Sequence, residues 1–231
     1  MLAYKVMILV VLTSASGEGS RSHHYYVTTN NSSDCPPFSH CQTLSKYTQQ
    51  HDNIFVSNTI VEFLSGLHEM NSTGLILIAS VKNLTLIGSD SFMESPDGYS
   101  YSDSVVFCTN HSGLFFWDVT ELKIINITFT HCGATPPMPF LLSYIALGFM
   151  ETTSLVLSGV TVEDSIGFGL YGYNIWKNVV VTDCNFIRNN EYIRRISQCI
   201  NPSEPSTCIG GNVRLYYTVP FPFYNNKPTH V

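Results

Sequence analysis

The sequence predicts an all-β fold, a right-handed parallel β-helix solenoid with a short N-terminal capping helix. Residues 121–133, "ELKIINITFTHCG", alternate apolar and polar side chains, change phase once at Ile125-Asn126 and then resume the alternation. Residues 178–190, "NVVVTDCNFIRNN", do the same. In neither stretch does a helical period separate the alternation before the change of phase from the alternation after it. Alternation indicates a strand with one buried face, and the change of phase indicates a bend after which side chains again point inward. The sequence therefore predicts two strands joined by a corner in each repeat.

The repeats align in columns. The alignment is anchored on one apolar residue in each of four repeats, and these anchors are 38, 33 and 24 residues apart. The anchors form the first of six expected inward columns, which are Leu84-Leu122-Leu155-Val179, Leu86-Ile124-Leu157-Val181, Ile127-Val160-Cys184, Phe129-Val162-Phe186, Ile76-Leu114-Leu147-Tyr171 and Ile78-Phe116-Phe149-Tyr173. Units of this size cannot bury their own apolar face, so each must stack on its neighbour. The alternative is a leucine-rich repeat, because "LKIINITF" loosely fits its Leu-x-Leu-x-x-Asn core. That repeat has one short strand, whereas here a second strand follows the corner, which favours the β-helix.

The first residues predict a signal peptide, residues 1–16. Lys5 precedes the apolar run from Val6 to Leu12, and small residues around Ser14 to Ser16 follow. An ordinary N-terminal strand is the alternative. No stretch reaches the roughly 18 apolar residues of a membrane helix, so we expect no membrane span in this chain and a secreted, extracellular protein.

Residues 17–57 are expected to form an N-terminal region with a small cysteine loop and a capping helix. Thr43 is a suitable N-cap for a short helix over 43–51, which would cover the end of the solenoid. The β-helix is then expected over 58–231, and residues 90–103 and 133–140 are expected to be loops that leave it.

The C-terminal residues predict the opening strand of one more repeat, because Val213 and Leu215 alternate within 208–219. Prolines follow, and no amphipathic cap is visible after Val219. A solenoid without a cap exposes strand edges, so we expect a truncated relative of a longer ectodomain, prone to end-to-end self-association. Alternatively, Pro220 and Pro222 themselves blunt the edge.

The seven cysteines fit an oxidising compartment. Close spacing suggests disulfides Cys35-Cys41 and Cys199-Cys208, Cys108-Cys132 is the next plausible pair, and Cys184 is left as a buried thiol. Asn-x-Ser/Thr sequons occur at Asn30, Asn31, Asn71, Asn83, Asn110 and Asn126, the last four being our predicted glycosylation sites.

The charge argues against polyanionic partners. The chain has a formal net charge of -6 with 11 Lys+Arg, and "RNNEYIRRISQC" is its basic cluster. We therefore expect no nucleic-acid partner.

Several segments together resemble a known class of proteins. In "VEFLSGLHEM", 61–70, an apolar strand leads to Gly-x-Tyr/His-x-apolar, as in the first coil of pectin-lyase-like right-handed β-helices. Together with "YYVT", "CPPFSHC", "QTLSKYTQQ", "NLTLIG" and "GLFFWDVTELKIINITFTHCG", it is similar to extracellular repeat proteins of early-branching animals. The resemblance covers about Tyr25 to Asn190 and implies the fold far more than an activity.

Pectin-lyase-like folds include polysaccharide lyases and glycosidases, and each of these activities requires particular residues. A lyase needs carboxylates for calcium and a basic residue for the proton, and a glycosidase needs a carboxylate pair. The acids of the repeats are scattered: Asp118, Glu121, Glu151, Glu163, Asp164 and Asp183. Asp118 and Glu151 share a column, but stacked outward acids are usually solvated surface. His68 and His131 are isolated, and no histidine has metal-ligand spacing with the cysteines. We therefore predict no catalytic residue, cofactor or metal.

Aromatic residues are the better candidates for binding. If Phe116 points inward, Phe115 and Trp117 point outward, where they could stack on sugar rings or protein side chains. The alternative is that the apolar loop 137–145 covers them. The sequence thus predicts a non-enzymatic extracellular module that binds an unidentified glycan or protein, or has a structural role; a polysaccharide lyase or glycosidase, active or degenerate, is the alternative.

Overall fold

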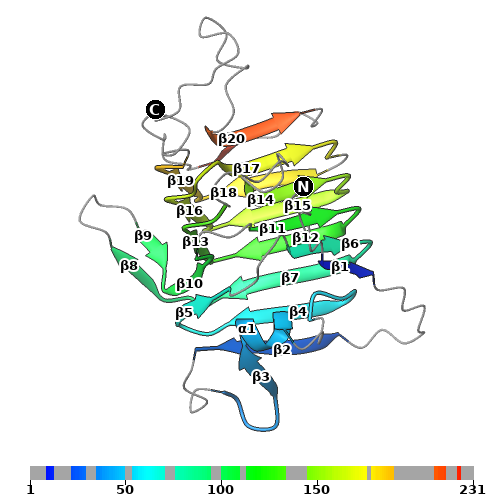
Figure 1. Ribbon diagram of the computed structural model, residues 1–231, viewed down its shortest axis with the longest axis vertical. Coiled ribbons are helices and arrows are strands. Elements are labelled where there is room, and N and C mark those ends of the chain that lie inside the picture. Colours follow the sequence, from blue (N-terminus) through cyan, green and yellow to red (C-terminus); the bar gives the residue numbers. More distant parts are fainter. Residues whose placement is uncertain are drawn as a thin grey trace, which may run out of the picture.

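The fold is all-β and is dominated by parallel sheets in a computed structural model of the chain (Figure 1). The structure describes residues 9–12, 22–29, 35–49, 54–70, 76–94, 100–109, 113–133, 145–175, 178–189, 211–216 and 223–224.

Three parallel sheets make up the body of the molecule. The first sheet has the order β1-β6-β11-β14-β17-β20, formed by Leu9–Leu12, Ile76–Ala79, Leu114–Trp117, Ile145–Met150, Phe168–Tyr173 and Gly211–Tyr216. The second has the order β21-β18-β15-β12-β7-β4-β2-β3, formed by Phe223–Tyr224, Asn178–Thr182, Ser154–Ser158, Thr120–Ile125, Lys82–Gly88, Thr59–Phe63, His23–Thr28 and His40–Thr43. The third has the order β19-β16-β13-β10-β5, formed by Asn185–Ile187, Thr161–Glu163, Thr128–Thr130, Ser104–Phe107 and Gly66–Glu69.

From β10 to β21, consecutive strands belong to different sheets. The chain passes through β11, β12 and β13, then through β14, β15 and β16, and then through β17, β18 and β19, visiting the three sheets in the same order each time. Each such passage is called a coil here. Every coil lies parallel on the preceding one, as Figure 1 shows. This arrangement is consistent with a β-solenoid.

The corners between strands use residues in the left-handed backbone region. Asn126 (φ 51°) lies between β12 and β13, and Gly159 (φ 63°) and Asp183 (φ 52°) take the equivalent positions in the next two coils. The backbone N–H of Asn126 donates to the carbonyl of Ser158, so the corners stack as the strands do. Asn and Asp tolerate this region better than other non-glycine residues. The predicted corner at Ile125-Asn126 is thereby confirmed.

The core is the stack of inward columns. The register pairs Leu122 with Leu84 and Leu155, and Leu155 with Val179, all at most 5% exposed. All six predicted columns lie in one apolar cluster, apart from Tyr171 and Tyr173, the last members of the two first-sheet columns. Because every apolar layer is covered by the next coil, burial is nearly complete in the middle of the molecule.

One predicted register is wrong by one residue. In β17, Leu170 pairs with Leu147 and Gly172 pairs with Phe149, so Tyr171 and Tyr173 face outward and are half-buried. The cause is an insertion at the corner. Six positions separate Phe149 from Leu155, as in the two preceding coils, whereas seven separate Gly172 from Val179. An ungapped alignment could not include that extra residue.

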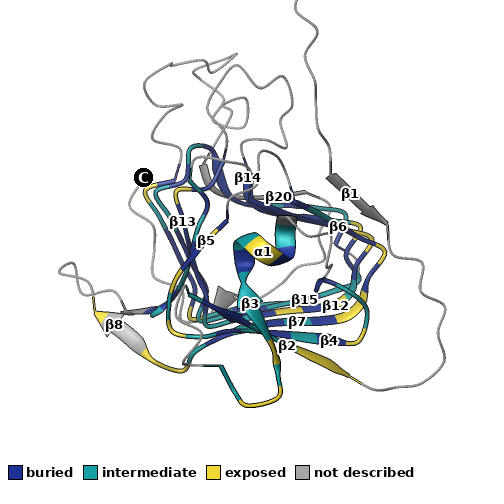
Figure 2. Cartoon of the chain, turned by 60° about the horizontal axis from the view of Figure 1, so that its bottom comes forward, coloured by how far each residue is buried: buried dark blue, intermediate teal, exposed yellow. Residues whose placement is uncertain are grey.

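Helix α1, Leu44–Gln49, lies where a short helix was expected. The backbone N–H of Lys46 donates to the hydroxyl of Thr43, the expected N-cap. Leu44 and Tyr47 are buried in the main cluster, and the Tyr47 hydroxyl donates to the carbonyl of His40 at 3.0 Å. Figure 2 shows α1 in front of the ring formed by the coils.

Two segments differ from simple expectation. The predicted loop 90–103 contains an antiparallel hairpin of β8, Phe92–Glu94, and β9, Ser100–Ser102. Strand β1 pairs in parallel with β6 and lies within the predicted signal peptide, whose cleavage stays a prediction.

The predicted opening strand of one more coil is confirmed as β20, which pairs with β17. Pro220, Pro222 and most of the loop 133–140 lie outside the described residues. None of the described helices could span a membrane.

Candidate functional site

The first sheet carries the predicted aromatic site on its outer face, and half of that prediction is wrong. Phe115 points away from the main core but is only 2% exposed. It packs in a second apolar cluster with Ile145 and Phe168, against half-buried Leu77, Met150 and Tyr171. Its ring lies against Gly148 of the next coil, where a β-carbon would collide with it. Phe115 is therefore a packing residue, and the cover expected from the loop 137–145 includes Ile145.

Trp117 remains accessible at the end of the same strand. It is 44% exposed, and its Nε1–H donates to the Glu151 carboxylate at 3.0 Å. The hydrogen bond links two neighbouring coils and restrains the accessible indole ring.

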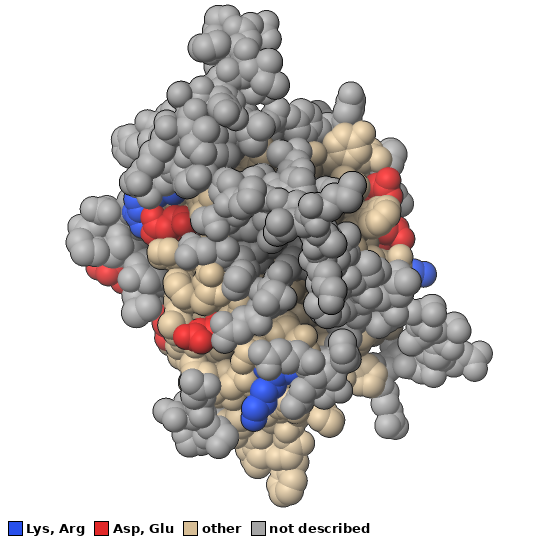
Figure 3. All heavy atoms as spheres, viewed as in Figure 1, with Lys and Arg blue, Asp and Glu red and all other residues tan. Residues whose placement is uncertain are grey.

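Four of the acids named from the sequence, Asp118, Glu151, Glu163 and Asp164, contact a side chain of a neighbouring coil. Asp118 accepts a hydrogen bond from the Ser80 hydroxyl at 3.1 Å. Arg188 donates to Asp164 at 2.7 Å and to Glu163 at 3.0 Å. Burial raises the pKa of Glu163, with a further contribution from the charge of Asp164, while Arg188 opposes both effects. Figure 3 shows charged side chains in small separate groups on this face of the molecule.

Two predicted disulfides are present, Cys35-Cys41 and Cys108-Cys132. Cys199 and Cys208 lie outside the described residues. Cys184 is the expected buried thiol: its Sγ–H donates to the Thr182 carbonyl, and burial raises its pKa to about 12. A thiol with that pKa is almost entirely protonated at neutral pH and is a poor nucleophile.

Two predicted glycosylation sites can be located. Asn83 is exposed, and its amide donates to the Asn58 side chain at 3.4 Å. Asn126 is half-buried at its corner and donates to Asp90 at 3.2 Å. Asn71 and Asn110 lie outside the described residues. Glycosylation at all four stays a prediction.

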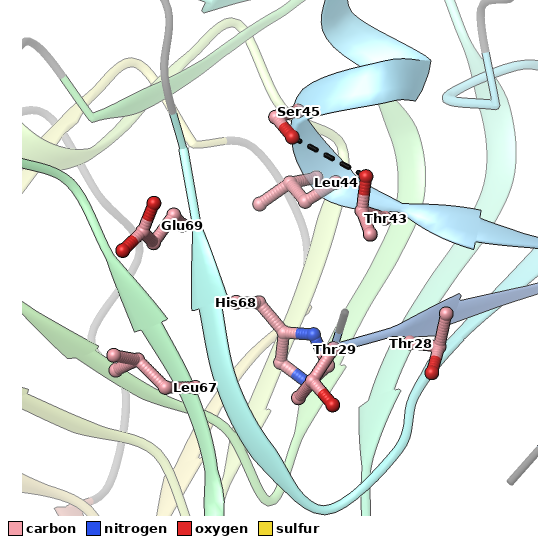
Figure 4. A pocket seen from close by; sticks show the side chains of 8 residues that line it. All are labelled: Thr28, Thr29, Thr43, Leu44, Ser45, Leu67, His68 and Glu69. Atoms are coloured by element: carbon pink, nitrogen blue, oxygen red, sulfur yellow. Dashed lines mark hydrogen bonds between the residues drawn. The ribbon is translucent and has the colours of Figure 1, made fainter. Parts of the chain in front are cut away.

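A pocket opens at the N-terminal end of the molecule, where the third sheet ends at β5. Its volume is about 290 Å³, and strand β2, the start of α1 and strand β5 surround it. Figure 4 shows its lining, which consists of Thr28, Thr29, Thr43, Leu44, Ser45, Leu67, His68 and Glu69. His68 lies on one side of the β5 ribbon and Leu67 and Glu69 on the other, as strand alternation requires.

His68 and Thr28 are the two buried polar residues of this pocket, and His68 is the more deeply buried. It is 2% exposed, its Nε2 lies 2.6 Å from the Leu64 carbonyl, and its Nδ1 has no hydrogen-bond partner. Its ring meets Phe63 edge to face. The sequence showed an isolated histidine, because the three elements around it come from separate stretches of the chain. In the described part of the chain, no group of three His, Cys, Asp or Glu side chains could hold a metal ion.

No protein-family model matches this sequence, and comparison with curated proteins and with solved structures finds no significant match.

Proposed function

We propose that this protein is a secreted, non-enzymatic module of the right-handed parallel β-helix type, resembling pectin-lyase-like proteins, that serves extracellular interaction or structure. The fold supports this proposal through its three parallel sheets, its repeated strand order and its stacked corners. Helix α1 acts in this proposal as the N-terminal cap, because it inserts Leu44 and Tyr47 into the end of the core.

The observation that carries the proposal is the use made of the carboxylates. Asp118, Glu151 and Asp164 each bind a side chain of a neighbouring coil, namely Ser80, Trp117 and Arg188. A carboxylate that already accepts a structural hydrogen bond has fewer lone pairs for calcium or for proton transfer. These acids thus serve cohesion between coils, which suits a scaffold that presents a fixed surface.

The extracellular location is supported by the two disulfides, which persist in oxidising compartments. The predicted signal peptide supports it independently. Expression of the full chain in animal cells should give protein in the medium whose N-terminus follows the predicted cleavage region around Ser16. Retention of the whole chain inside the cells would contradict this part of the proposal.

A direct assay separates this proposal from the lyase or glycosidase alternative. The secreted protein is incubated with polygalacturonate, with and without calcium, and unsaturated products are followed by ultraviolet absorbance and new reducing ends by a colour reaction. We expect neither signal to rise above that of heat-denatured protein. Calcium-dependent accumulation of unsaturated products, or a steady rise in reducing ends, would overturn the non-enzymatic proposal.

Trp117 offers a test of the outer face as a binding surface. A glycan array or a panel of extracellular proteins is probed with the wild-type chain and with Trp117→Ala. Signals that are lost in the variant would assign binding to this face. Unchanged signals would direct attention to other surfaces.

A further inference from the structure

The N-terminal end of the molecule carries an exposed aromatic side chain. Three large hydrophobic side chains are exposed in the described part of the chain, Phe38, Leu67 and Trp117. The first two lie at this end, next to β3 and in β5, which are the last strands of the second and third sheets. Phe38 is fully exposed and has a left-handed backbone with φ 62°, which is rare for a bulky residue. Such a conformation costs free energy and persists only where the surrounding structure enforces it.

Two features enforce the conformation of this loop. The disulfide Cys35-Cys41 closes it. Inside it, the Pro36 carbonyl accepts hydrogen bonds from the Ser39 backbone N–H at 3.3 Å and from the Ser39 hydroxyl at 2.6 Å. A side chain on a rigid loop loses little conformational entropy on binding, and aromatic side chains are prominent among the residues that dominate protein interfaces. The loop thus presents Phe38 as a preorganised contact residue.

The loop leads directly into a strand with an open edge. One edge of β3 pairs with β2, and no other strand of the described residues pairs with β3. Figure 1 shows β3 at the N-terminal end of the stack, with the loop before it projecting beyond the body of the molecule. The four residues of β3 include no lysine or proline, the residues that often protect a strand edge. This edge can therefore pair with a strand of another chain.

The pocket lies at the other end of β3. Thr43 ends the strand, and Leu44 and Ser45 at the start of α1 continue the lining. Leu67, which is half-exposed, and the threonine methyl groups supply apolar surface. The volume of about 290 Å³ is close to the lower end of the range of ligand sites, about 300 to 1,000 Å³, and holds one aromatic ring. Phe38 and the pocket thus lie at opposite ends of one edge strand.

We propose that two copies of this chain associate through their N-terminal ends, with their β3 strands paired antiparallel and Phe38 of each copy in the pocket of the other. A two-fold axis makes a strand antiparallel to its own copy. With the axis between Cys41 and Gln42, Phe38 lies as far before the axis as Ser45 lies after it. The pairing therefore brings Phe38 to the level of the pocket of the second copy, which supplies the aromatic side chain that the pocket lacks in one copy alone.

The charges at this end permit the contact. The chain has a formal net charge of -6, which disfavours self-association in general. Residues 35–43 contain no Asp, Glu, Lys or Arg. Helix α1 contributes Lys46 and the pocket lining contributes Glu69, and these two formal charges cancel. The two copies thus meet at locally neutral surfaces. This inference goes beyond the proposed function, because it holds for an interaction module and for an enzyme alike.

Sedimentation of the secreted full chain over a concentration series tests the association. We expect a monomer–dimer equilibrium with a dissociation constant on the order of 10 μM. Phe38→Ala should raise this constant about tenfold or more. Its control is Trp117→Ala, which removes the exposed aromatic side chain of the first sheet and should leave the equilibrium unchanged. A wild-type chain that stays monomeric about tenfold above the expected constant, or a Phe38→Ala variant that dimerises equally well, would overturn the proposal.

A second pair of variants tests the pocket. Leu67→Trp fills it from an exposed position, and the control is Val105→Trp on the neighbouring strand, which pairs with Leu67 but does not line the pocket. Leu67→Trp should weaken the dimer, and Val105→Trp should not. A mixture of Leu67→Trp and Phe38→Ala chains should dimerise better than either variant alone, because the mixed pair keeps one of the two contacts intact. A mixture that dimerises no better than the separate variants would contradict the reciprocal arrangement.

Photo-crosslinking locates the contact. Full chain in which p-benzoylphenylalanine replaces Phe38 is mixed with wild-type chain labelled with nitrogen-15 and irradiated, and the products are mapped by mass spectrometry. We expect crosslinks between copies at residues 43–45 or at Leu67. Crosslinks confined to one copy, or to other segments of the second copy, would overturn the proposal. Cleavage of polygalacturonate would overturn the proposed function and leave this inference standing.

Discussion

The middle coils and the N-terminal end of the molecule follow the same strand geometry but differ in how their inner faces are covered. In the middle, from β11 to β19, each inward residue has a neighbour above and below, as Leu155 has in Leu122 and Val179. At the N-terminal end the second sheet continues through β4, β2 and β3, whereas the third sheet stops at β5. The uneven end leaves a pocket that α1 borders on one side.

The difference teaches where polar groups can enter a repetitive core. In the middle coils the inward positions are apolar, and the buried polar side chains, such as Thr128 and Asn185, lie at other positions and are hydrogen-bonded. At the end of the stack, a histidine and several threonines reach the inner surface from β5 and β2. Uniform stacking thus gives cohesion, and its interruption at β5 leaves a pocket with polar groups in its lining.

The largest expected effect comes from a charge in the middle of the stack. Leu155→Asp puts a carboxylate at a position that is 1% exposed between two apolar neighbours, and we expect loss of the fold, about 4 kcal/mol or more. The control is Val156→Asp, which is half-buried on the outward side of the same strand and should cost about 1 kcal/mol. Urea unfolding followed by circular dichroism measures both. A soluble Leu155→Asp protein with native stability would show that the register is wrong.

Removing each disulfide in turn compares how much the two regions contribute to stability. Cys108-Cys132 joins neighbouring coils and closes a loop with a sequence separation of 24, whereas Cys35-Cys41 at the N-terminal end has a separation of 6. On loop entropy alone, replacing the first pair by serine should cost about 3.4 kcal/mol and replacing the second about 2.2 kcal/mol. Thermal unfolding of the two double variants gives the order. A larger loss for the Cys35-Cys41 variant would mean that the N-terminal end limits stability.

The smallest expected effect is the response of the N-terminal end to acid. The unfolded chain binds a proton at His68 near the usual pKa of 6.5, whereas burial lowers the pKa of the folded ring. The stability contribution is therefore complete above pH 6.5 and is lost as the pH falls from there toward the folded value. His68→Phe should make the free energy of unfolding less dependent on pH between about pH 5 and 7. An unchanged pH dependence would show that other groups govern it.

The inward columns could be predicted because they depend on local alternation alone. Leu122, Leu155 and Val179 each repeat a strand pattern that one stretch of sequence displays by itself. The register of β17 could not, because it depends on the length of a corner. Residue identity did not reveal the extra residue between Gly172 and Val179, since Tyr171 and Tyr173 are as compatible with an inward column as with an outward one.

The candidate sites depended on contacts between distant segments, and for that reason they were harder to predict. Phe115 is outward by alternation, yet Ile145 and Phe168 of later coils cover it. The pocket needs the end of β2, the first turn of α1 and strand β5 together. The disulfide between Cys108 and Cys132 was easier, since the two closely spaced pairs left it as the next plausible pairing, and the two cysteines follow the paired strands β10 and β13.

Stacked corners also set a length scale for the molecule. Because Asn126, Gly159 and Asp183 turn the chain in the same way, each coil advances the chain by one strand spacing, about 4.8 Å. Insertion of a further copy of the coil that contains β14, β15 and β16 would then lengthen the rod by that increment without disturbing the residues at either end. The number of coils therefore works as a ruler, and it sets how far apart two partners bound at opposite ends would be held.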